Sequence, residues 1–208
     1  MKIVKPSVTL LAVSPDPMGL IERCGRICYK SEGKITPDSA TLFVSILLDR
    51  HHDSVTEHAG ATLLFVCDRG VSHEIVRHRI ASYSQESTRY CNYGLDKHGG
   101  EIAVIQPPAL DEKELDLWTS AMQAVESTYL ALLAYGCPPQ IARSVLPTCL
   151  KTEIAVTMNM REWRHFLTLR LAKAAHPQMR EVAAMARDIL IGLAKPLFEE
   201  FLEEPHER

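Results

Sequence analysis

The sequence predicts an α+β protein in which residues 1–208 form a single domain, with packed helices around a mainly antiparallel sheet. Three observations favour this fold. The chain is long enough to bury one sizeable core. It contains no internal repeat, linker or low-complexity segment. Its helical and strand patterns are mixed irregularly, whereas parallel α/β folds alternate them in a fixed order.

Hydrophobic periodicity and turn-forming residues divide the chain into its expected elements. The first half is predicted to contain a strand at 8–13, a helix at 18–29, a helix opening at 37–39, a polar loop at 51–60, a strand at 61–68 and a helix at 71–79. The second half is predicted to contain a strand at 100–108, a helix from 111, a strand at 150–160 and helices at 161–173 and 178–194.

The helix from Asp111 has the clearest pattern. Glu114 follows Asp111 by three residues, which is the spacing of a capping box. Large apolar residues then recur every three or four positions, as on one buried helix face. Gly136 and Pro138 end the pattern, as a C-terminal glycine and a following proline do in many helices.

Arg170 lies on a helix face that the sequence predicts to be buried. Successive helix residues rotate by about 100°, so Arg170 falls roughly 20° from Trp163, between Phe166 and Leu167. A buried guanidinium is costly unless it meets an anion or several acceptors. Two interpretations stay open: a structural arginine, paired or extended outward, and an arginine that faces a ligand in a cleft.

Composition narrows the classes of function. A formal charge of -3 argues against a general affinity for nucleic acid. No apolar run approaches the ~18 to 20 residues of a membrane span, and Pro and Asp interrupt the first apolar stretch below signal-peptide length. The six cysteines have neither a CxxC pair nor a disulfide-like spacing. Reduced thiols, and hence a cytoplasmic protein, are expected.

Residues 76–94, VRHRIASYSQESTRYCNYG, concentrate three arginines, a histidine and seven hydroxyl side chains. The sequence has no GxGxxG, GxxxxGK[ST], GxSxG or HExxH motif. A phosphate would therefore have to be held by side chains. Arg77, Arg79 and Arg89 suit this role because guanidinium groups bind phosphate bidentately. The segment predicts a site for a phosphorylated small molecule, with a solvated charged surface as the alternative.

Other clusters suggest further candidates. His52 and Asp53 resemble the His-Asp doublet of metal-dependent phosphohydrolases, but the neighbouring histidines fit no standard metal-site spacing, so no metal is expected. Ser87 would need an adjacent base to act as a nucleophile, and hydrogen bonding to a ligand is the preferred role. Cys91 adjoins the arginines, which would stabilise its thiolate, although a packed cysteine is preferred.

The segment RHRIASYSQESTRY, residues 77–90, resembles the RHRxxSxNxxSxR signature of the flavin-dependent thymidylate synthases. Further segments are similar to this family and occur in its order: HHDSVTEH (51–58), PPQIARSVLP (138–147), NMREWRHFLTLR (159–170) and HPQMRE (176–181). The resemblance implies the flavin-dependent thymidylate synthase fold. Departures from residues found in other members fall at Glu74, Ser84, Gln85 and His165, and none removes an arginine that the mechanism needs.

The resemblance implies two ligand sites. FAD would be bound by Ser54, Arg77, His78, Arg79, Gln85, Asn159, Arg161 and His165. Deoxyuridine monophosphate (dUMP) would be bound by Glu74, Arg77, Gln85, Glu86, Ser87, Thr88, Arg89, Arg143 and Arg170. The family is typically a homotetramer with active sites at subunit interfaces, so arginines of one subunit would complete the pocket of another.

The resemblance also gives Arg170 a catalytic role. A fixed cation beside uracil N3 and O2 would favour the N3-deprotonated form. Electron density would then build at C5, which attacks the one-carbon unit of methylenetetrahydrofolate. FAD reduced by NADPH would supply the hydride that completes the methyl group of dTMP.

Three other functions stay open from the sequence. A related enzyme would modify another pyrimidine nucleotide with the same cofactor. A nucleotide-binding module would have lost catalysis, although Arg77, His78, Arg79 and Arg170 are all intact. A phosphohydrolase at His52 and Asp53 would lose its activity to a chelator.

Overall fold

A computed structural model describes residues 1–202. Its strands are β1 (Lys2–Val4), β2 (Ser7–Val13), β3 (Gly60–Asp68), β4 (Ala81–Gln85), β5 (Ala103–Ile105) and β6 (Lys151–Asn159). Its α-helices are α1 (Pro17–Cys28), α2 (Ser39–Asp49), α3 (Arg69–Ile75), α4 (Glu112–Ala134), α5 (Pro139–Ala142), α6 (Met160–Arg170) and α7 (Pro177–Phe198). Short 3₁₀ helices are η1 (Glu32–Lys34), η2 (Asp53–His58), η3 (Asp96–His98), η4 (Arg143–Val145) and η5 (Glu199–Leu202).

The strands form a four-stranded sheet in the order β2-β3-β6-β4 and a separate parallel pair of β1 and β5. β3 and β6 run in opposite directions. The hydroxyls of Thr62 and Thr157 are 2.9 Å apart, and beyond the other end of β3 the backbone N–H of Arg69 donates to the carbonyl of Leu150, just before β6. The prediction of an α+β fold with a mainly antiparallel sheet is confirmed.

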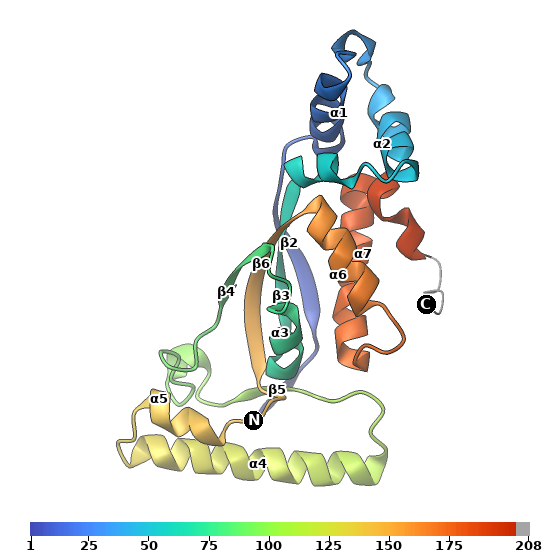
Figure 1. The fold of residues 1–208 in the computed structure, drawn as a ribbon. Helices are drawn as coiled ribbons and strands as arrows, with labels where there is room; N and C mark the ends of the chain where they lie inside the picture. The colour runs from blue at the N-terminus through green and yellow to red at the C-terminus, as the bar shows by residue number, and fades with distance from the viewer. Residues whose placement is uncertain (203–208) are drawn as a thin grey trace. The chain divides into compact units, whose positions relative to one another are not determined.

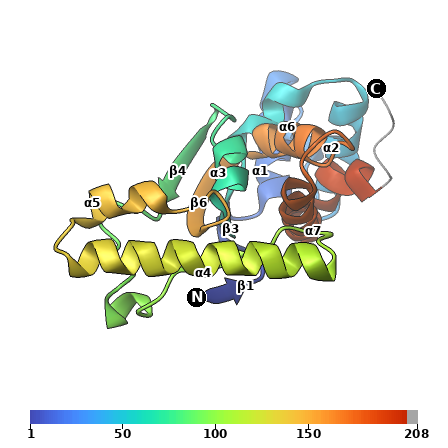
Figure 2. The same ribbon diagram turned by 90° about the horizontal axis from the view of Figure 1, so that it is seen from below.

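The described chain divides into two compact units. Unit 1 comprises Met1–Ser7, Val66–Ile75 and Ser84–Ile154. Its core contains buried residues from β5, α4 and the segments beside them: Tyr93, Ile102, Val104, Tyr129, Ala142 and Leu150. The helix α5 lies beside α4, as Figure 2 shows. The predicted capping box of α4 is present, with reciprocal hydrogen bonds between Asp111 and Glu114.

Unit 2 comprises Val8–Phe65, Val76–Tyr83 and Ala155–Arg208. Within it α1 packs on α2, and α6 packs on α7 (Figure 1). The rings of Trp163 and Phe166 are fully buried 5.4 Å apart, and Phe65 of β3 packs against both. The Trp163 indole N–H donates to the carbonyl of Ala61, which ties the first turns of α6 to β3. Burial of this face fixes how α6 presents its remaining side chains.

Several elements differ from the sequence predictions. Residues 53–58 form η2 rather than a loop, and the Thr56 hydroxyl donates to the carbonyl of Asp53 within it. The helix predicted at 71–79 is α3, which begins at 69 and ends at 75, with its start bonded to the Asp68 carboxylate. The strand predicted at 100–108 is reduced to β5. The family resemblance implied a helix within 138–147, where the structure has α5 and η4. The strands β1 and β4 were not predicted, and the single-domain organisation stays a prediction.

Over residues 1–202, no helix combines the length and apolar character that crossing a membrane requires.

Candidate active site

The candidate residues divide between the two units. Unit 2 contains every predicted flavin residue except Gln85. Unit 1 contains every predicted nucleotide residue except Arg77 and Arg170. The two predicted sets are therefore largely sorted by unit, which the sequence did not indicate.

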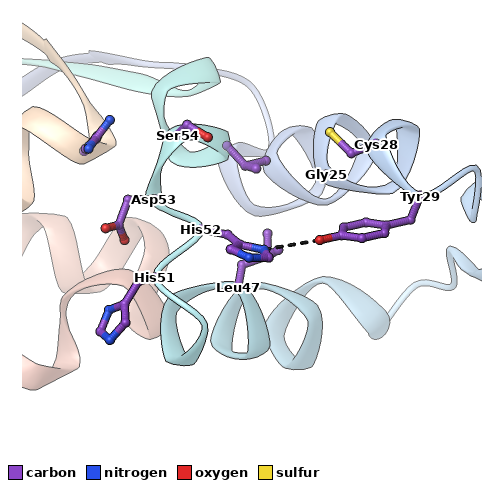
Figure 3. Close-up of a pocket in the computed structure, with 10 residues that line it drawn as sticks. Gly25, Cys28, Tyr29, Leu47, His51, His52, Asp53 and Ser54 are labelled. Carbon is purple, nitrogen blue, oxygen red and sulfur yellow. Dashed lines mark hydrogen bonds between the residues drawn. The ribbon is translucent and has the colours of Figure 1, made fainter.

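A cavity of about 330 Å³ in unit 2 is lined by two of the predicted flavin residues, Ser54 and Arg161. It lies beside α1, α2 and η2, and Figure 3 shows the Tyr29 hydroxyl pointing toward His52. That hydroxyl is 3.4 Å from His52 Nδ1. Arg161 Nη1 forms an ion pair with Glu57 at 2.5 Å. The lining also includes the Asp53 carboxylate, so the groups that suit an anionic ligand are the Arg161 guanidinium, the Ser54 hydroxyl and the two imidazoles.

Arg77 and Arg79 lie on the segment between α3 and β4, one on each side of His78. Both arginines are exposed, whereas His78 is buried. Within residues 1–202 neither guanidinium has a hydrogen-bond or ion-pair partner in the protein. Charged donors in this state can bind a phosphate without first breaking a protein contact.

The buried ring of His78 connects α6 to this segment. Its Nδ1 is 3.0 Å from Glu162 Oε1, and its Nε2 accepts a hydrogen bond of 3.1 Å from Arg170 Nε. Burial lowers the pKa of His78 below its usual value; the charges of Arg170 and His165 also lower it, against the hydrogen bond and charge of Glu162. Because Arg170 donates to Nε2, that nitrogen is unprotonated and the ring is neutral in this contact.

Arg170 is the last residue of α6 and is half-buried. The helical-wheel prediction is confirmed for its neighbours, because Trp163, Phe166 and Leu167 are fully buried. The guanidinium meets an imidazole acceptor at Nε. The hydrogen bond to His78 therefore fixes the orientation of the Arg170 guanidinium.

His78, Glu162 and His165 bring potential metal-ligand atoms within 4.8 Å of one another. The spacing of histidines in the sequence predicts no metal site and does not bring these three residues together. Both ring nitrogens of His78 are engaged in hydrogen bonds, and one of them faces a cation. A metal would have to displace Glu162 or Arg170 from the ring, so the geometry favours a hydrogen-bonded network.

Asn159 and His165 occupy opposite ends of the first two turns of α6. The Asn159 carboxamide oxygen accepts from the backbone N–H of Glu162 at 2.8 Å and thereby caps the helix. His165 is exposed, and its ring meets that of His78 edge-on at 5.5 Å. Asn159 thus has a structural role, besides any contact that its amide nitrogen makes with a ligand.

In unit 1, the side chains of Gln85 and Glu86 are held by other protein groups. Gln85 Nε2 donates to the hydroxyls of Ser72 and Thr152, at 2.9 and 3.2 Å. The two carboxylate oxygens of Glu86 accept from the Tyr93 hydroxyl at 2.7 Å and from Lys151 Nζ at 3.2 Å. A direct reading of a base by these groups would use the remaining lone pairs.

Residues 87–91 form a tight turn in which the carbonyl of Ser87 accepts from the backbone of Tyr90 and Cys91. Arg89 is exposed, and Thr88 is buried. Arg143 Nη1 donates to the Thr88 hydroxyl at 3.2 Å, which brings the predicted phosphate ligands Thr88 and Arg143 together. Glu74 is half-buried on α3.

Sequence reasoning missed the groups that hold these side chains: Ser72, Tyr93, Lys151, Thr152 and Glu162. Glu162 follows Asn159 by three residues, which is the spacing of a capping box. That signal identifies a helix start and gives no sign of a contact with His78.

The α+β fold and this set of arginine, hydroxyl and amide side chains are those expected of a nucleotide-handling enzyme, and the sequence has no glycine-rich phosphate-binding loop. The family described as thymidylate synthase complementing protein matches residues 9–194. The chain belongs to this family, the flavin-dependent thymidylate synthases.

Curated relatives and solved structures agree with this assignment. A flavin-dependent thymidylate synthase of Geobacter sulfurreducens is 37% identical over 198 residues, covering 92% of this chain and 84% of that protein. ThyX of Helicobacter pylori, solved with FAD and dUMP, shares the fold with a TM-score of 0.78, 24% identity and coverage of 95% and 99%. PolB of Streptomyces cacaoi, a UMP/dUMP methylase solved with 5-Br dUMP, has a TM-score of 0.83, 24% identity and coverage of 97% of each chain.

Proposed function

We propose that the protein converts dUMP to dTMP, with methylenetetrahydrofolate as carbon donor and NADPH-reduced FAD as hydride source, for thymidylate synthesis. The proposal rests on the geometry of Arg170, whose half-buried guanidinium donates a hydrogen bond from Nε to the neutral imidazole of His78. It lies in a chain whose curated relatives, 33% to 37% identical, are named flavin-dependent thymidylate synthases.

The residues of unit 2 fit FAD. Exposed Arg77 and Arg79 offer charged donors to its phosphates, and the cavity lined by Ser54 and Arg161 offers a hydroxyl and a further cation. His78, Gln85, Asn159 and His165 complete the proposed set. Bound flavin supplies hydride-transfer chemistry that no side chain of the protein provides.

The residues of unit 1 fit the nucleotide. Ser87, Thr88, Arg89 and Arg143 form the proposed phosphate set, supported by the Arg143–Thr88 hydrogen bond and by the exposure of Arg89. The rest of the proposed dUMP set is Glu74, Arg77, Gln85, Glu86 and Arg170. Glu86 is the least suited to bind by its side chain, because Tyr93 and Lys151 already occupy both of its oxygens.

Arg170 is the proposed catalytic residue. Its positive charge stabilises the negative charge that develops on the uracil ring when N3 loses its proton, which raises the electron density at C5. C5 then forms a bond to the one-carbon unit, and the bond between that carbon and the folate nitrogen breaks, so that tetrahydrofolate leaves. C5 loses its hydrogen as a proton, a hydride from the reduced flavin would complete the methyl group, and N3 regains its proton. A guanidinium keeps its proton throughout, so it acts by charge rather than as an acid.

The proposal includes a cytoplasmic homotetramer with active sites at subunit interfaces. The six cysteines are all free thiols, as expected in a reducing compartment. The helix α4 leaves apolar side chains exposed or half-buried, with Leu117 73% exposed and Tyr135, just after its end, 91% exposed. Exposed apolar surface of this kind is typical of subunit contacts.

Methylation of another pyrimidine nucleotide is the second candidate. It is favoured by the fold shared with PolB, a UMP/dUMP methylase. The fold alone does not choose between the two nucleotides. The names of the more similar curated relatives favour dUMP.

The test is the visible spectrum of the purified protein, followed by turnover. Flavin bands near ~370 and ~450 nm are expected, with a shift on adding dUMP. Conversion of dUMP to dTMP should require methylenetetrahydrofolate and NADPH, and UMP in place of dUMP tests the second candidate. A colourless protein that takes up no added FAD and makes no dTMP refutes the proposal.

A further inference from the structure

Glu162 is a buried carboxylate that the proposed reaction does not yet use. It lies in the first turn of α6, and only 7% of the residue is exposed. A glutamate at this capping-box position ordinarily binds the backbone at the helix start. The Glu162 side chain instead contacts His78, 84 residues away in sequence. A buried carboxylate is costly unless it is paired and hydrogen-bonded, and His78 is the partner that the structure gives it.

The hydrogen-bond donors fix the tautomer of His78. Arginine Nε carries a hydrogen and cannot accept, so His78 Nε2 must be the acceptor in the contact with Arg170. The single proton of the neutral ring therefore lies on Nδ1. This proton points at the Glu162 carboxylate. An ionised carboxylate has no hydrogen to donate, so Glu162 is the acceptor.

We propose that Glu162 is a positioning residue that orients Arg170 through the neutral ring of His78. The inference rests on the proposed function, which gives Arg170 its catalytic role. Glu162 keeps the ring proton on Nδ1, and the free Nε2 lone pair anchors the Nε–H of Arg170. Without the carboxylate, the proton could move to Nε2, where it would face the arginine N–H donor to donor.

The ring of His78 has little room to move when Glu162 is changed. The ring of Phe166 packs on it at 5.1 Å and that of His165 at 5.5 Å. The Tyr83 hydroxyl donates to the backbone carbonyl of His78. The tautomer, rather than the ring position, is therefore the property that Glu162 controls.

Two substitutions separate the charge of Glu162 from its acceptor oxygen. Glu162→Gln keeps an oxygen for Nδ1–H and loses the charge, whereas Glu162→Ala loses both. We expect kcat for dTMP formation to fall about 10- to 100-fold in Glu162→Ala and to stay within about threefold in Glu162→Gln, with KM for dUMP and flavin content little changed. Glu200→Gln is the matched control, because it removes a carboxylate paired at 2.7 Å with Arg164 of the same helix.

The pH profile gives a readout that a merely structural role would not move. Protonation of His78 puts a hydrogen on Nε2 and removes the acceptor of Arg170, so kcat should fall as pH drops through the pKa of His78. Burial, Arg170 and His165 lower that pKa, and Glu162 raises it. Loss of the charge in Glu162→Gln should therefore shift the acid limb of kcat to lower pH.

Nitrogen NMR of the full chain with labelled histidine reads the tautomer without turnover. Nε2 of His78 should be unprotonated in the wild type and in Glu162→Gln, and partly protonated in Glu162→Ala. A protonated Nε2 in the wild type, an unmoved acid limb, or an unchanged kcat in Glu162→Ala overturns the inference. If the wild type makes no dTMP, the proposed function fails, and the NMR result alone decides whether Glu162 sets the tautomer.

Discussion

Replacement of Tyr93 by phenylalanine removes one hydroxyl from the network that holds Glu86. Tyr93 Oη donates to Glu86 Oε1 at 2.7 Å. The Tyr93 ring is buried 6.0 Å from that of Tyr129, and phenylalanine preserves this contact. The substitution therefore tests the hydrogen bond with little change in packing.

The expected loss follows from the charge and exposure of the acceptor. A hydrogen bond to a charged group contributes about 1.5 to 3 kcal/mol. Glu86 is half-buried and keeps Lys151 at 3.2 Å, so water and the ammonium offset part of the loss. We expect the free energy of unfolding to fall by about 1.5 kcal/mol, which is roughly a tenfold change in the unfolding equilibrium.

Urea denaturation measures this loss from the shift in midpoint at constant slope. Tyr90→Phe is the control, because the Tyr90 side chain is 78% exposed and its substitution should change the midpoint little. Burial and the hydrogen bond to Glu86 raise the pKa of Tyr93 above its usual value. The raised pKa means that the stabilisation is complete below about pH 10, the value for an unfolded tyrosine, and is lost as pH rises above it. A loss below about 0.5 kcal/mol at pH 7 would refute the assigned strength of this bond.

Two further substitutions test single roles in the candidate flavin site. Asn159→Ala removes the helix cap of α6 and should lower the free energy of unfolding by about 1 kcal/mol in the same urea assay; an unchanged midpoint contradicts the cap. Arg161→Ala should release FAD, measured by flavin absorbance after gel filtration, while stability changes by less than about 1 kcal/mol because its ion pair is exposed. Arg23→Ala, which breaks another exposed ion pair, should keep its flavin, and full flavin retention in Arg161→Ala contradicts the assigned contact.

The elements that the sequence predicted well are those with a strong local signal. The helix α4 has a capping box at Asp111, regular apolar spacing and a glycine at its end, and each signal is independent of the rest of the chain. The strand β4 was not predicted, because its residues are mostly small or polar and its pairing partner, β6, lies far away in sequence. Long-range pairing of this kind leaves little trace in a local window.

The candidate site shows the same limit. The helical wheel identified Arg170 because a cation on an apolar face is a local anomaly. It could not identify His78, since the contact joins α6 to a segment 92 residues earlier. The role of Glu162 was harder still to recognise from the sequence, because its position three residues after Asn159 is already explained by helix capping. Residues that bind ligands leave compositional signals, whereas residues that orient them become visible only in the fold.

The arrangement of charges around Arg170 has a physical reason. A carboxylate bonded directly to Nε would orient the guanidinium, but it would also offset the positive charge on which the proposed role of Arg170 depends. At Nε the contact is a neutral imidazole, and the carboxylate of Glu162 lies one ring farther away. In this contact, His78 orients the guanidinium at close range, and the negative charge of Glu162 acts from farther away, where its effect on the cation is weaker. On this reasoning, a glutamate in direct contact with Arg170 would orient the guanidinium as firmly as His78 does. It would still slow the reaction, because its negative charge would offset the positive charge of Arg170.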